Sequence, residues 1–278
     1  MALDNLPGVY PAGPYSAPPG PTASGLTTAQ QFRADCRAGK VQGITRNQCP
    51  GYVQTFFVAL PRAHALDFMV FCQRNQKPCP VLEVVDGGGF EPRRMAPGAD
   101  LRTDLAKYSV YRHGERVEDV EDVRALWRED FVSFLIGSNT SCDLALRRAG
   151  VQTFKYRWVV RTAIECDPAG PFGGPMICTM RWLTPQELVI ATQLTSRFPF
   201  NHGVPIHVGD PAAIGADLAH PLTGEPPPPV PAGMIPTFWG CSVTPHMAAI
   251  NARLELMVTS APACGFITDV ETDKFGSP

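Results

Sequence analysis

The chain has 278 residues, which is enough to bury a sizeable core in one large or two modest domains. Its 44% hydrophobic and 18% charged residues are typical of a soluble globular protein, and a formal net charge of −2 excludes the basic surface that nucleic acid binding needs. No apolar run approaches the ~20 residues that span a bilayer, so we expect neither a nucleic acid nor a membrane partner.

Residues 1–21 are rich in Pro, Gly, Ala and Ser, so we expect a flexible tail or an arm that docks on a neighbour. This segment has neither the basic nor the apolar region of a secretory signal. The nine cysteines are odd in number and mostly lie in apolar segments, which favours reduced thiols and a cytoplasmic location. We also expect the protein to form a homo-oligomer.

Hydrophobic periodicity predicts the elements in chain order. In the first half it indicates helices at 27–39 and 62–75 and strands at 54–60, 81–85, 108–111 and 131–136. In the second half, Thr184, Pro185 and Glu187 form the capping box and first-turn proline that begin a helix. The strands expected around it cover 175–182, 204–208, 237–243, 256–260 and 266–270. Strands separated by helices favour an α/β fold, with a mixed-sheet main domain that has helices on both faces.

Residues 86–129 differ from their flanks. They begin with a turn-rich Asp-Gly-Gly-Gly sequence and then become densely charged. We therefore expect a smaller α+β subdomain at 86–129, inserted into a main α/β domain formed by 22–85 and 130–278.

The stretch TSRFPFNHGVPIHVGDPAAIG at 195–215 carries a cation, two imidazoles that titrate near neutral pH and a carboxylate. These are Arg197, His202, His207 and Asp210. The histidines and the aspartate suit a divalent metal, but their spacing matches no metal-binding pattern, so we expect no metal. Asp210 is expected to cap a helix that begins at Pro211, while His202 either holds the loop or binds substrate. That arrangement leaves His207 as a catalytic acid–base group near a helix N-terminus, with Asp210 beside it.

Cys241 ends a predicted strand just before a helix that is expected to begin at Thr244. The helix dipole would lower the pKa of the thiol, and the end of the strand would present it to a crevice, so Cys241 is a candidate catalytic residue. A buried core cysteine is the alternative. Thr244 is expected to cap the helix and also to contact substrate, with Ser242 beside it.

Arginine suits bidentate recognition of a carboxylate, although most arginines form surface contacts or ion pairs. Arg161, its neighbour Thr162 and Arg197 are therefore candidates for binding a small carboxylic or amino acid substrate. The strands that end near 208 and 243 both lead into a capping residue followed by proline. We expect His207 and Cys241 to line one cavity, with Arg161 or Arg197 opposite.

A series of uncommon sequence words runs through roughly 51–269. They are PGYVQ (50–54), ALDF (65–68), FCQRNQKPCPVLEV (71–84), GADLRTDLAKYSVYRHGE (98–115), FLIG (134–137), RT (161–162), RFPxxHGxPxHxGDPxxxG (197–215), FWGCSVTP (238–245) and FITD (266–269). In this order they resemble a bacterial hydro-lyase family whose animal relative is the mitochondrial D-glutamate cyclase.

The resemblance implies a two-part architecture and a reaction that needs no cofactor. The related cyclase makes 5-oxo-D-proline from D-glutamate by loss of water, with neither ATP nor an organic cofactor. Such a site needs a base for the ammonium, donors for the developing oxyanion and an acid for the leaving oxygen. The resemblance assigns these roles to His207, Cys241 and backbone N–H groups near Thr244. Through GADLRTD it adds Arg102 as a carboxylate clamp.

This chain departs from the family words at several places. The family's GCSFSFE is GSNTSCD at 137–143, its tyrosine before RT is Val160, and its glutamine at the end of ACGVTPQ is His246. A histidine of the family is replaced by Ser260. Changes that cluster in these motifs favour a pocket with altered substrate specificity on the same fold. We therefore expect a hydro-lyase or cyclase that acts on a small amino or hydroxy acid. A non-catalytic binding or regulatory protein on the same scaffold is the alternative.

Overall fold

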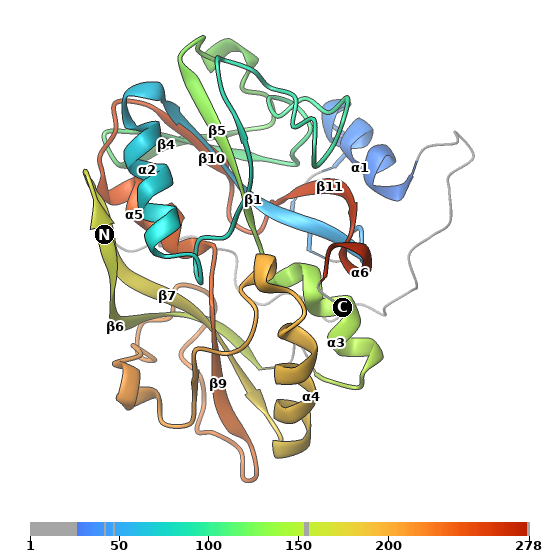
Figure 1. The fold of residues 1–278 in the computed structure, drawn as a ribbon, viewed down its shortest axis with the longest axis vertical. Coiled ribbons are helices and arrows are strands. Elements are labelled where there is room, and N and C mark those ends of the chain that lie inside the picture. The colour runs from blue at the N-terminus through green and yellow to red at the C-terminus, as the bar shows by residue number, and fades with distance from the viewer. Residues whose placement is uncertain (1–26, 42, 47, 153–155, 277–278) are drawn as a thin grey trace.

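A computed structural model describes residues 27–41, 43–46, 48–152 and 156–276, and the tail expected at 1–21 lies outside them. Two antiparallel sheets form the framework, the larger in the upper half of Figure 1 and the smaller in the lower half. The larger sheet has the strand order β2-β5-β1-β10-β3-β4, and β11 also pairs with β1. Its strands are β1 (Tyr52–Pro61), β2 (Val81–Val85), β3 (Tyr108–Arg112), β4 (Glu115–Val120), β5 (Phe131–Gly137), β10 (Met257–Ser260) and β11 (Phe266–Glu271).

Strand β1 is the centre of the larger sheet, because it pairs with β5, β10 and β11. It is buried on both faces, which its run of aromatic and aliphatic residues allows. Phe56 and Val58 pack on one face with the helices α2 (Arg62–Arg74) and α5 (Val243–Asn251). Phe57 and Ala59 pack on the other face, against the chain from 95 to 123.

Residues 86–129, the segment expected to form an inserted subdomain, supply strands to the larger sheet. β3 pairs with β10, and β4 extends the sheet to its edge. Buried side chains of this segment, such as Leu101 and Tyr108, share a core with Phe57 of β1. Part of the segment therefore extends the larger sheet, and part of it covers one face of that sheet.

The smaller sheet has the order β6-β7-β9-β8. Its strands are β6 (Arg157–Ala169), β7 (Phe172–Leu183), β8 (His207–Val208) and β9 (Ile235–Gly240). One face carries an apolar cluster that the chain between 206 and 234 covers. The opposite face meets α3 (Asp143–Arg148), α4 (Pro185–Thr195) and α5.

The sequence predicts the starts of α2 and α4 and places that of α1 within one residue, but α5 begins earlier than predicted and α3 and α6 were not predicted. In α4 the Glu187 N–H donates to Thr184 Oγ1 at 3.2 Å and the Thr184 N–H donates to Glu187 Oε2 at 2.9 Å, which confirms the predicted capping box. The first helix, α1 (Thr28–Arg37), begins with a similar box between Thr27 and Gln30. The short α6 (Thr272–Phe275) follows β11. The short 3₁₀ helices are η1 (Arg124–Leu126), η2 (Asn139–Cys142), η3 (Pro199–Asn201) and η4 (Pro211–Ile214).

The α/β class is confirmed. Within it, every strand pairing among the described residues is antiparallel, so the sheets are not of the mixed kind that alternating strands and helices had favoured. The strands pair either through hairpins or with partners far along the chain, and both routes return the chain in the opposite direction. No helix in the described part of the chain is both long and apolar enough to cross a membrane.

Gly137 at the end of β5 provides a test of how tightly the two halves are packed. A Cβ at this position would lie 1.7 Å from the Phe200 carbonyl oxygen, which belongs to a turn leading into the smaller sheet. We expect Gly137→Ala to lower the free energy of unfolding by about 3 kcal/mol or more, since backbone rather than a flexible side chain must move. Urea denaturation measures the change. Gly173→Ala is the control, because its Cβ meets only the Pro168 Cβ at 3.4 Å, and an equal loss there would contradict the argument.

Candidate functional site

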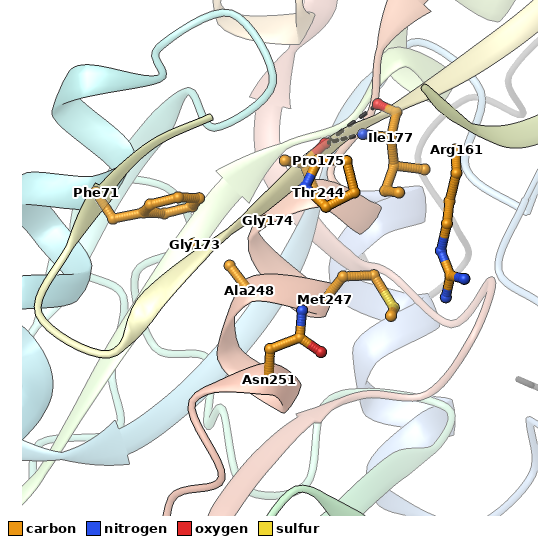
Figure 2. A pocket seen from close by; sticks show the side chains of 10 residues that line it. All are labelled: Phe71, Arg161, Gly173, Gly174, Pro175, Ile177, Thr244, Met247, Ala248 and Asn251. Atoms are coloured by element: carbon orange, nitrogen blue, oxygen red, sulfur yellow. Dashed lines mark hydrogen bonds between the residues drawn. The ribbon is translucent and has the colours of Figure 1, made fainter. Parts of the chain in front are cut away.

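A cavity of about 290 Å³ lies between α2, the β6–β7 hairpin and α5 (Figure 2). It is mainly apolar, with an arginine, an asparagine and a threonine among its lining residues. The lining consists of Phe71, Arg161, Gly173, Gly174, Pro175, Ile177, Thr244, Met247, Ala248 and Asn251. A mostly apolar hollow with few polar groups is the usual form of a small-molecule site.

Arg161 supplies the only positive charge among the lining residues. It projects from β6, where it pairs with Ile177 of β7, and it is half-buried. Among the described residues its guanidinium has neither an ion-pair partner nor a hydrogen-bond partner, and Figure 2 shows the group extended away from the neighbouring side chains. A half-buried guanidinium without a carboxylate suits an anionic ligand.

Thr244 and Asn251 contribute the other polar groups of the cavity, from opposite ends of α5. Thr244 does not cap the helix as predicted, since α5 begins at Val243, one residue earlier. Its Oγ1 accepts a hydrogen bond from the Ile177 N–H at 3.0 Å and donates to the Ile177 carbonyl at 3.1 Å, which ties α5 to β7. The Asn251 amide lies opposite Gly174, which has φ +119° and would place a Cβ 3.4 Å from Asn251 Nδ2. Glycine at 174 therefore preserves both this backbone conformation and the space beside the amide.

Cys241 is buried behind the wall of the cavity. It packs in a cluster with Val159, Ile177 and Met247, and the last two also line the cavity. Burial raises the pKa of the thiol, while the Thr179 hydroxyl, the Val243 N–H and Arg181 oppose that rise. The expectation of a lowered pKa is therefore wrong, because desolvation outweighs the helix N-terminus. Cys241 is a protonated thiol near neutral pH.

His207 and Asp210 lie on the other face of the smaller sheet. His207 pairs with Phe238 of β9, and their rings are 5.7 Å apart between centroids. Phe238 packs with Val160, whereas Cys241 packs with Val159. Successive residues of a strand point to opposite faces, so the prediction that His207 and Cys241 line one cavity is wrong.

The His207–Asp210 loop is held by local hydrogen bonds. His207 Nε2 lies 2.8 Å from the Asp210 carbonyl oxygen, which accepts a hydrogen bond from the ring. Asp210 Oδ1 accepts from the Ala212 N–H at 2.9 Å, so the predicted cap is confirmed, although the element it caps is the four-residue η4. The hydrogen bonds of His207 and Asp210 therefore account for both residues as parts of a locally stabilised loop.

His202 is fully buried at the junction of the two sheets. Its φ of 73° is in the left-handed region, and its Nδ1 lies 3.0 Å from the Lys77 carbonyl oxygen. Burial lowers the pKa of the imidazole to about 4, so the ring is neutral at pH 7. His202 was expected either to stabilise the loop or to bind substrate, and its buried hydrogen bond to Lys77 fits the first of these roles.

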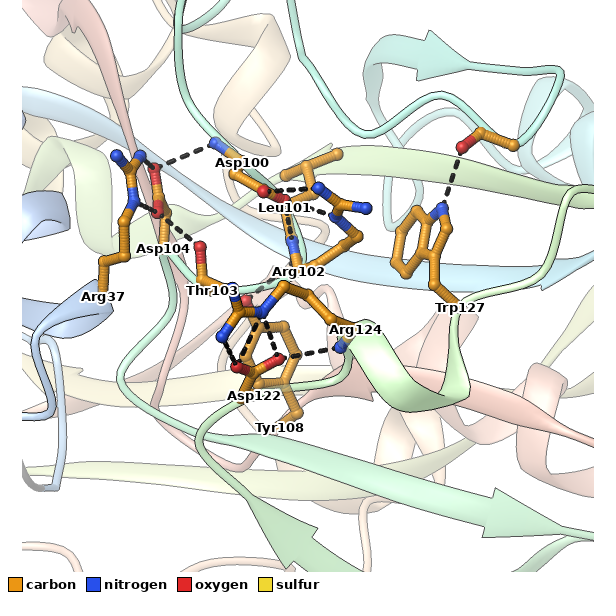
Figure 3. Close-up of polar contacts among 11 residues, drawn as sticks. Arg37, Asp100, Leu101, Arg102, Thr103, Asp104, Tyr108, Asp122, Arg124 and Trp127 are labelled. Atoms are coloured by element: carbon orange, nitrogen blue, oxygen red, sulfur yellow. Dashed lines mark hydrogen bonds and ion pairs between the residues drawn. The ribbon is translucent and has the colours of Figure 1, made fainter.

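Three other predicted substrate residues are engaged in protein contacts. Arg102 forms a bidentate pair with Asp100, at 2.9 and 2.8 Å (Figure 3). Its guanidinium also stacks over the Phe90 ring. Thr162 is buried and donates to the Met176 carbonyl at 2.8 Å. Arg197 is exposed after α4, with its guanidinium 5.9 Å from the Phe198 ring centroid. None of the three lines the cavity at Arg161.

Ser242 is half-buried and occupies the position before α5, where its side chain makes no capping hydrogen bond. Of the ten predicted site residues, the structure therefore brings Arg161 and Thr244 to the cavity, with Cys241 and Ser242 close by in the chain or in the packing.

Among the described residues, no group of three or more His, Cys, Asp or Glu side chains could hold a metal ion.

A second group of charged residues, absent from the sequence expectations, surrounds Asp143 at the start of α3. Its buried carboxylate accepts from Arg46 at 3.2 Å, Arg157 at 3.4 Å and Arg181 at 3.0 Å. Arg157 and Arg181 are paired residues of β6 and β7. Arg157, Val159 and Arg161 are spaced by two residues, and this spacing is the sequence signal that Arg157 and Arg161 lie on one face of a strand.

Sequence comparisons show which proteins this chain is similar to. The family model described as "D-glutamate cyclase" matches residues 132–269, which include β6, β7, β9 and α5. A "Putative hydro-lyase" of Stutzerimonas stutzeri is 46% identical over 251 residues, covering 88% of this chain and 94% of the relative. A protein of the same description from Bacillus subtilis is 44% identical over 251 residues, covering 88% and 97%.

One solved structure, of a nitrogen repressor-like protein from Methanococcus jannaschii, aligns with a TM-score of 0.41 and 9% identity. It covers 91% of this chain and 98% of that chain, but the score is too low to indicate a shared fold. The fold and the site define an α/β protein with two antiparallel sheets and an arginine-lined cavity beside them. The chain belongs to the family of these proteins described as "Putative hydro-lyase", and the D-glutamate cyclase model matches part of it.

The thiols offer a test of the burial described here. All nine cysteines are free and buried, and burial raises the pKa of Cys142 to about 12. We expect iodoacetamide at pH 8 to leave the native protein almost unmodified and to modify all nine thiols after unfolding, since the thiolate is the reactive form. Intact-mass spectrometry measures the count. Rapid modification of Cys241 in the native protein would show instead that its thiol is accessible and activated.

Two buried histidines predict how stability depends on pH. Burial lowers the pKa of both His202 and His246 to about 4 in the folded protein, below the value of 6.5 expected in the unfolded chain. The unfolded chain then binds protons first, so the free energy of unfolding falls as the pH drops from 6.5 to 4, by up to about 3 kcal/mol per histidine. Above pH 6.5 this contribution is complete.

Urea denaturation across this pH range measures the slope. His246→Gln should flatten the slope, because its partner Tyr111 can still receive or donate a hydrogen bond. His220→Gln is the matched control, since the His220 side chain is 84% exposed. Equal slopes for the protein and the His246→Gln variant would contradict the prediction.

Proposed function

We propose that this protein is a lyase that eliminates water from a small amino acid or a related carboxylic acid, in the manner of a D-glutamate cyclase and without a cofactor. The observation that carries the proposal is Arg161, a half-buried guanidinium with no carboxylate partner among the described residues, in the wall of a small cavity. Membership of the hydro-lyase family supports the reaction class.

The cavity supports a small substrate. A volume of about 290 Å³ lies at the lower end of the range for small-molecule sites, so it suits an amino acid better than a nucleotide. Arg161 would hold the substrate carboxylate through two parallel N–H···O bonds. The apolar side chains of Phe71 and Met247 would enclose the carbon chain and exclude water.

For cyclisation, the substrate amine attacks the carbon of the side-chain carboxyl group. A C–N bond forms and a C–O bond breaks, and the two protons that the substrate ammonium group loses end on the departing oxygen, which leaves as water. The Asn251 amide N–H would stabilise the oxyanion that develops during this attack, a role worth about 3 kcal/mol for one donor. Of the three residues predicted to be catalytic, Cys241 packs against two residues that line the cavity, Ile177 and Met247, but its buried thiol does not itself line it.

A non-catalytic carboxylate-binding protein is the second candidate. Among the described residues, the lining of the cavity contains no histidine, cysteine, aspartate or glutamate, so none of these acid–base groups borders the bound ligand directly. Binding without turnover would raise the melting temperature, because the ligand stabilises only the folded state.

A substrate panel separates the two candidates. We expect incubation with D- and L-amino acids, including D-glutamate and its analogues, to give one product that is lighter by the mass of water in liquid chromatography–mass spectrometry. Thermal stabilisation by a panel member without such a product would favour the binding protein. Neither a product nor stabilisation across the panel would contradict both.

Arg161→Gln tests the carboxylate contact. We expect it to raise KM or the ligand Kd about 10–100-fold, which corresponds to loss of a charge-assisted hydrogen bond. Arg161→Lys should recover part of the loss, since it keeps the charge without the bidentate geometry. Arg93→Gln is the control, because the Arg93 side chain is 84% exposed and is not among the residues that line the cavity. An unchanged KM in Arg161→Gln would remove this site from the proposal.

A further inference from the structure

The charged group around Asp143 is buried and has more positive than negative charge. The side chains of Asp143 and Arg181 are each 3% exposed, and that of Arg157 is 11% exposed. Both arginines donate to the one carboxylate of Asp143, and Arg46 donates to it as well. No other carboxylate in the described part of the chain forms an ion pair with Arg157 or Arg181.

The neighbouring thiols do not balance this charge. Burial raises the pKa of Cys142 to about 12, and it raises the pKa of Cys241 as well, so both are neutral near pH 7. A buried positive charge without a counterion is costly, and a protein usually compensates it with a partner or a bound ion. The charge of Arg157 and Arg181 together exceeds that of the carboxylate they share.

The donors of the arginines are also incompletely used. Arg157 Nη2 donates to Asn139 Oδ1 at 2.7 Å, and Asn139 Nδ2 donates to Thr179 Oγ1 at 2.8 Å, so neutral groups fix one side of the cluster. Arg181 Nε is buried and has no hydrogen-bond partner among the described residues. A buried donor without a partner marks a position where a ligand or an ion fits.

We propose that Arg157 and Arg181, together with Arg46, form a binding site for a small oxyanion such as a carboxylate or sulfate. This site is separate from the cavity at Arg161 and does not depend on the activity proposed above. The Arg46 and Arg157 side chains are 8% and 11% exposed, against 3% for Arg181, so the anion enters from their side of the cluster and meets Arg181 within it. Asp143 holds the guanidiniums together and limits how strongly the anion binds.

The test measures the melting temperature of the Arg161→Gln protein, so that the cavity at Arg161 does not contribute. This protein is the parent of the variants described below. Sodium acetate and sodium sulfate are titrated at millimolar concentrations, and sodium chloride keeps the ionic strength constant. We expect a rise of about 3 °C once the anion exceeds its Kd about tenfold. Acetate alone indicates a carboxylate ligand, and sulfate as well as acetate indicates a general oxyanion site.

Two further substitutions in the same background move the anion response in opposite directions. Arg157→Gln should remove most of the rise, because it takes away the more accessible guanidinium. Asp143→Asn should increase the rise, because the arginines then lack their internal carboxylate. Urea denaturation without added anion shows whether each variant folds, and Arg93→Gln, an exposed arginine, should respond like the parent.

The proposal is wrong if the parent shows no rise specific to acetate or sulfate. It is also wrong if folded Arg157→Gln responds as the parent does, or if folded Asp143→Asn responds less than the parent. If Arg157→Gln does not fold, the comparison of Asp143→Asn with the parent decides. These readouts do not involve turnover, so an inactive enzyme leaves the result interpretable.

Discussion

The pairing register of β6 with β7 is the constraint on which both charged sites depend. It sets Arg161 opposite Ile177 and Arg157 opposite Arg181, on the face of the smaller sheet that also carries Thr179. The other face is filled by Val160, Cys178, Met180 and Trp182. A shift of one residue would exchange the two faces, placing the arginines in an apolar cluster and the apolar residues beside Asp143. The cost of that exchange makes the register well defined.

Local rules predicted the elements whose signals lie within a few residues. The capping box of Thr184 and Glu187 marked α4, and the aromatic and aliphatic run of 54–60 marked the buried β1. β6 lacked such a signal, because its outer half, RTAIECDPA, contains charged residues and a proline. That part of the strand is stable because the hairpin pairs it with β7, and this pairing follows from tertiary structure rather than from local propensity.

A residue of the candidate site could be predicted where its chemical type alone indicated a role. It could not be predicted where the role depended on which face of a strand the side chain occupies. Arginine beside a strand indicated carboxylate binding, and Arg161 does line a cavity. His207 and Cys241 both lie near the ends of predicted strands, yet the register of β8 with β9 puts them on opposite faces. Asp143 and its arginines come from 46, 143, 157 and 181, so only the folded chain brings them together.

The position of β1 at the centre of the larger sheet has a consequence for biosynthesis. Its Phe57 N–H donates to Ser260 Oγ, a residue 203 positions later, and Thr55 pairs with Phe266. Most of the chain must leave the ribosome before β10 and β11 can flank β1. Until then β1 is an apolar strand with unpaired backbone groups on one edge, a form prone to self-association. The larger sheet therefore cannot close around β1 until residues 257–271 have been synthesised.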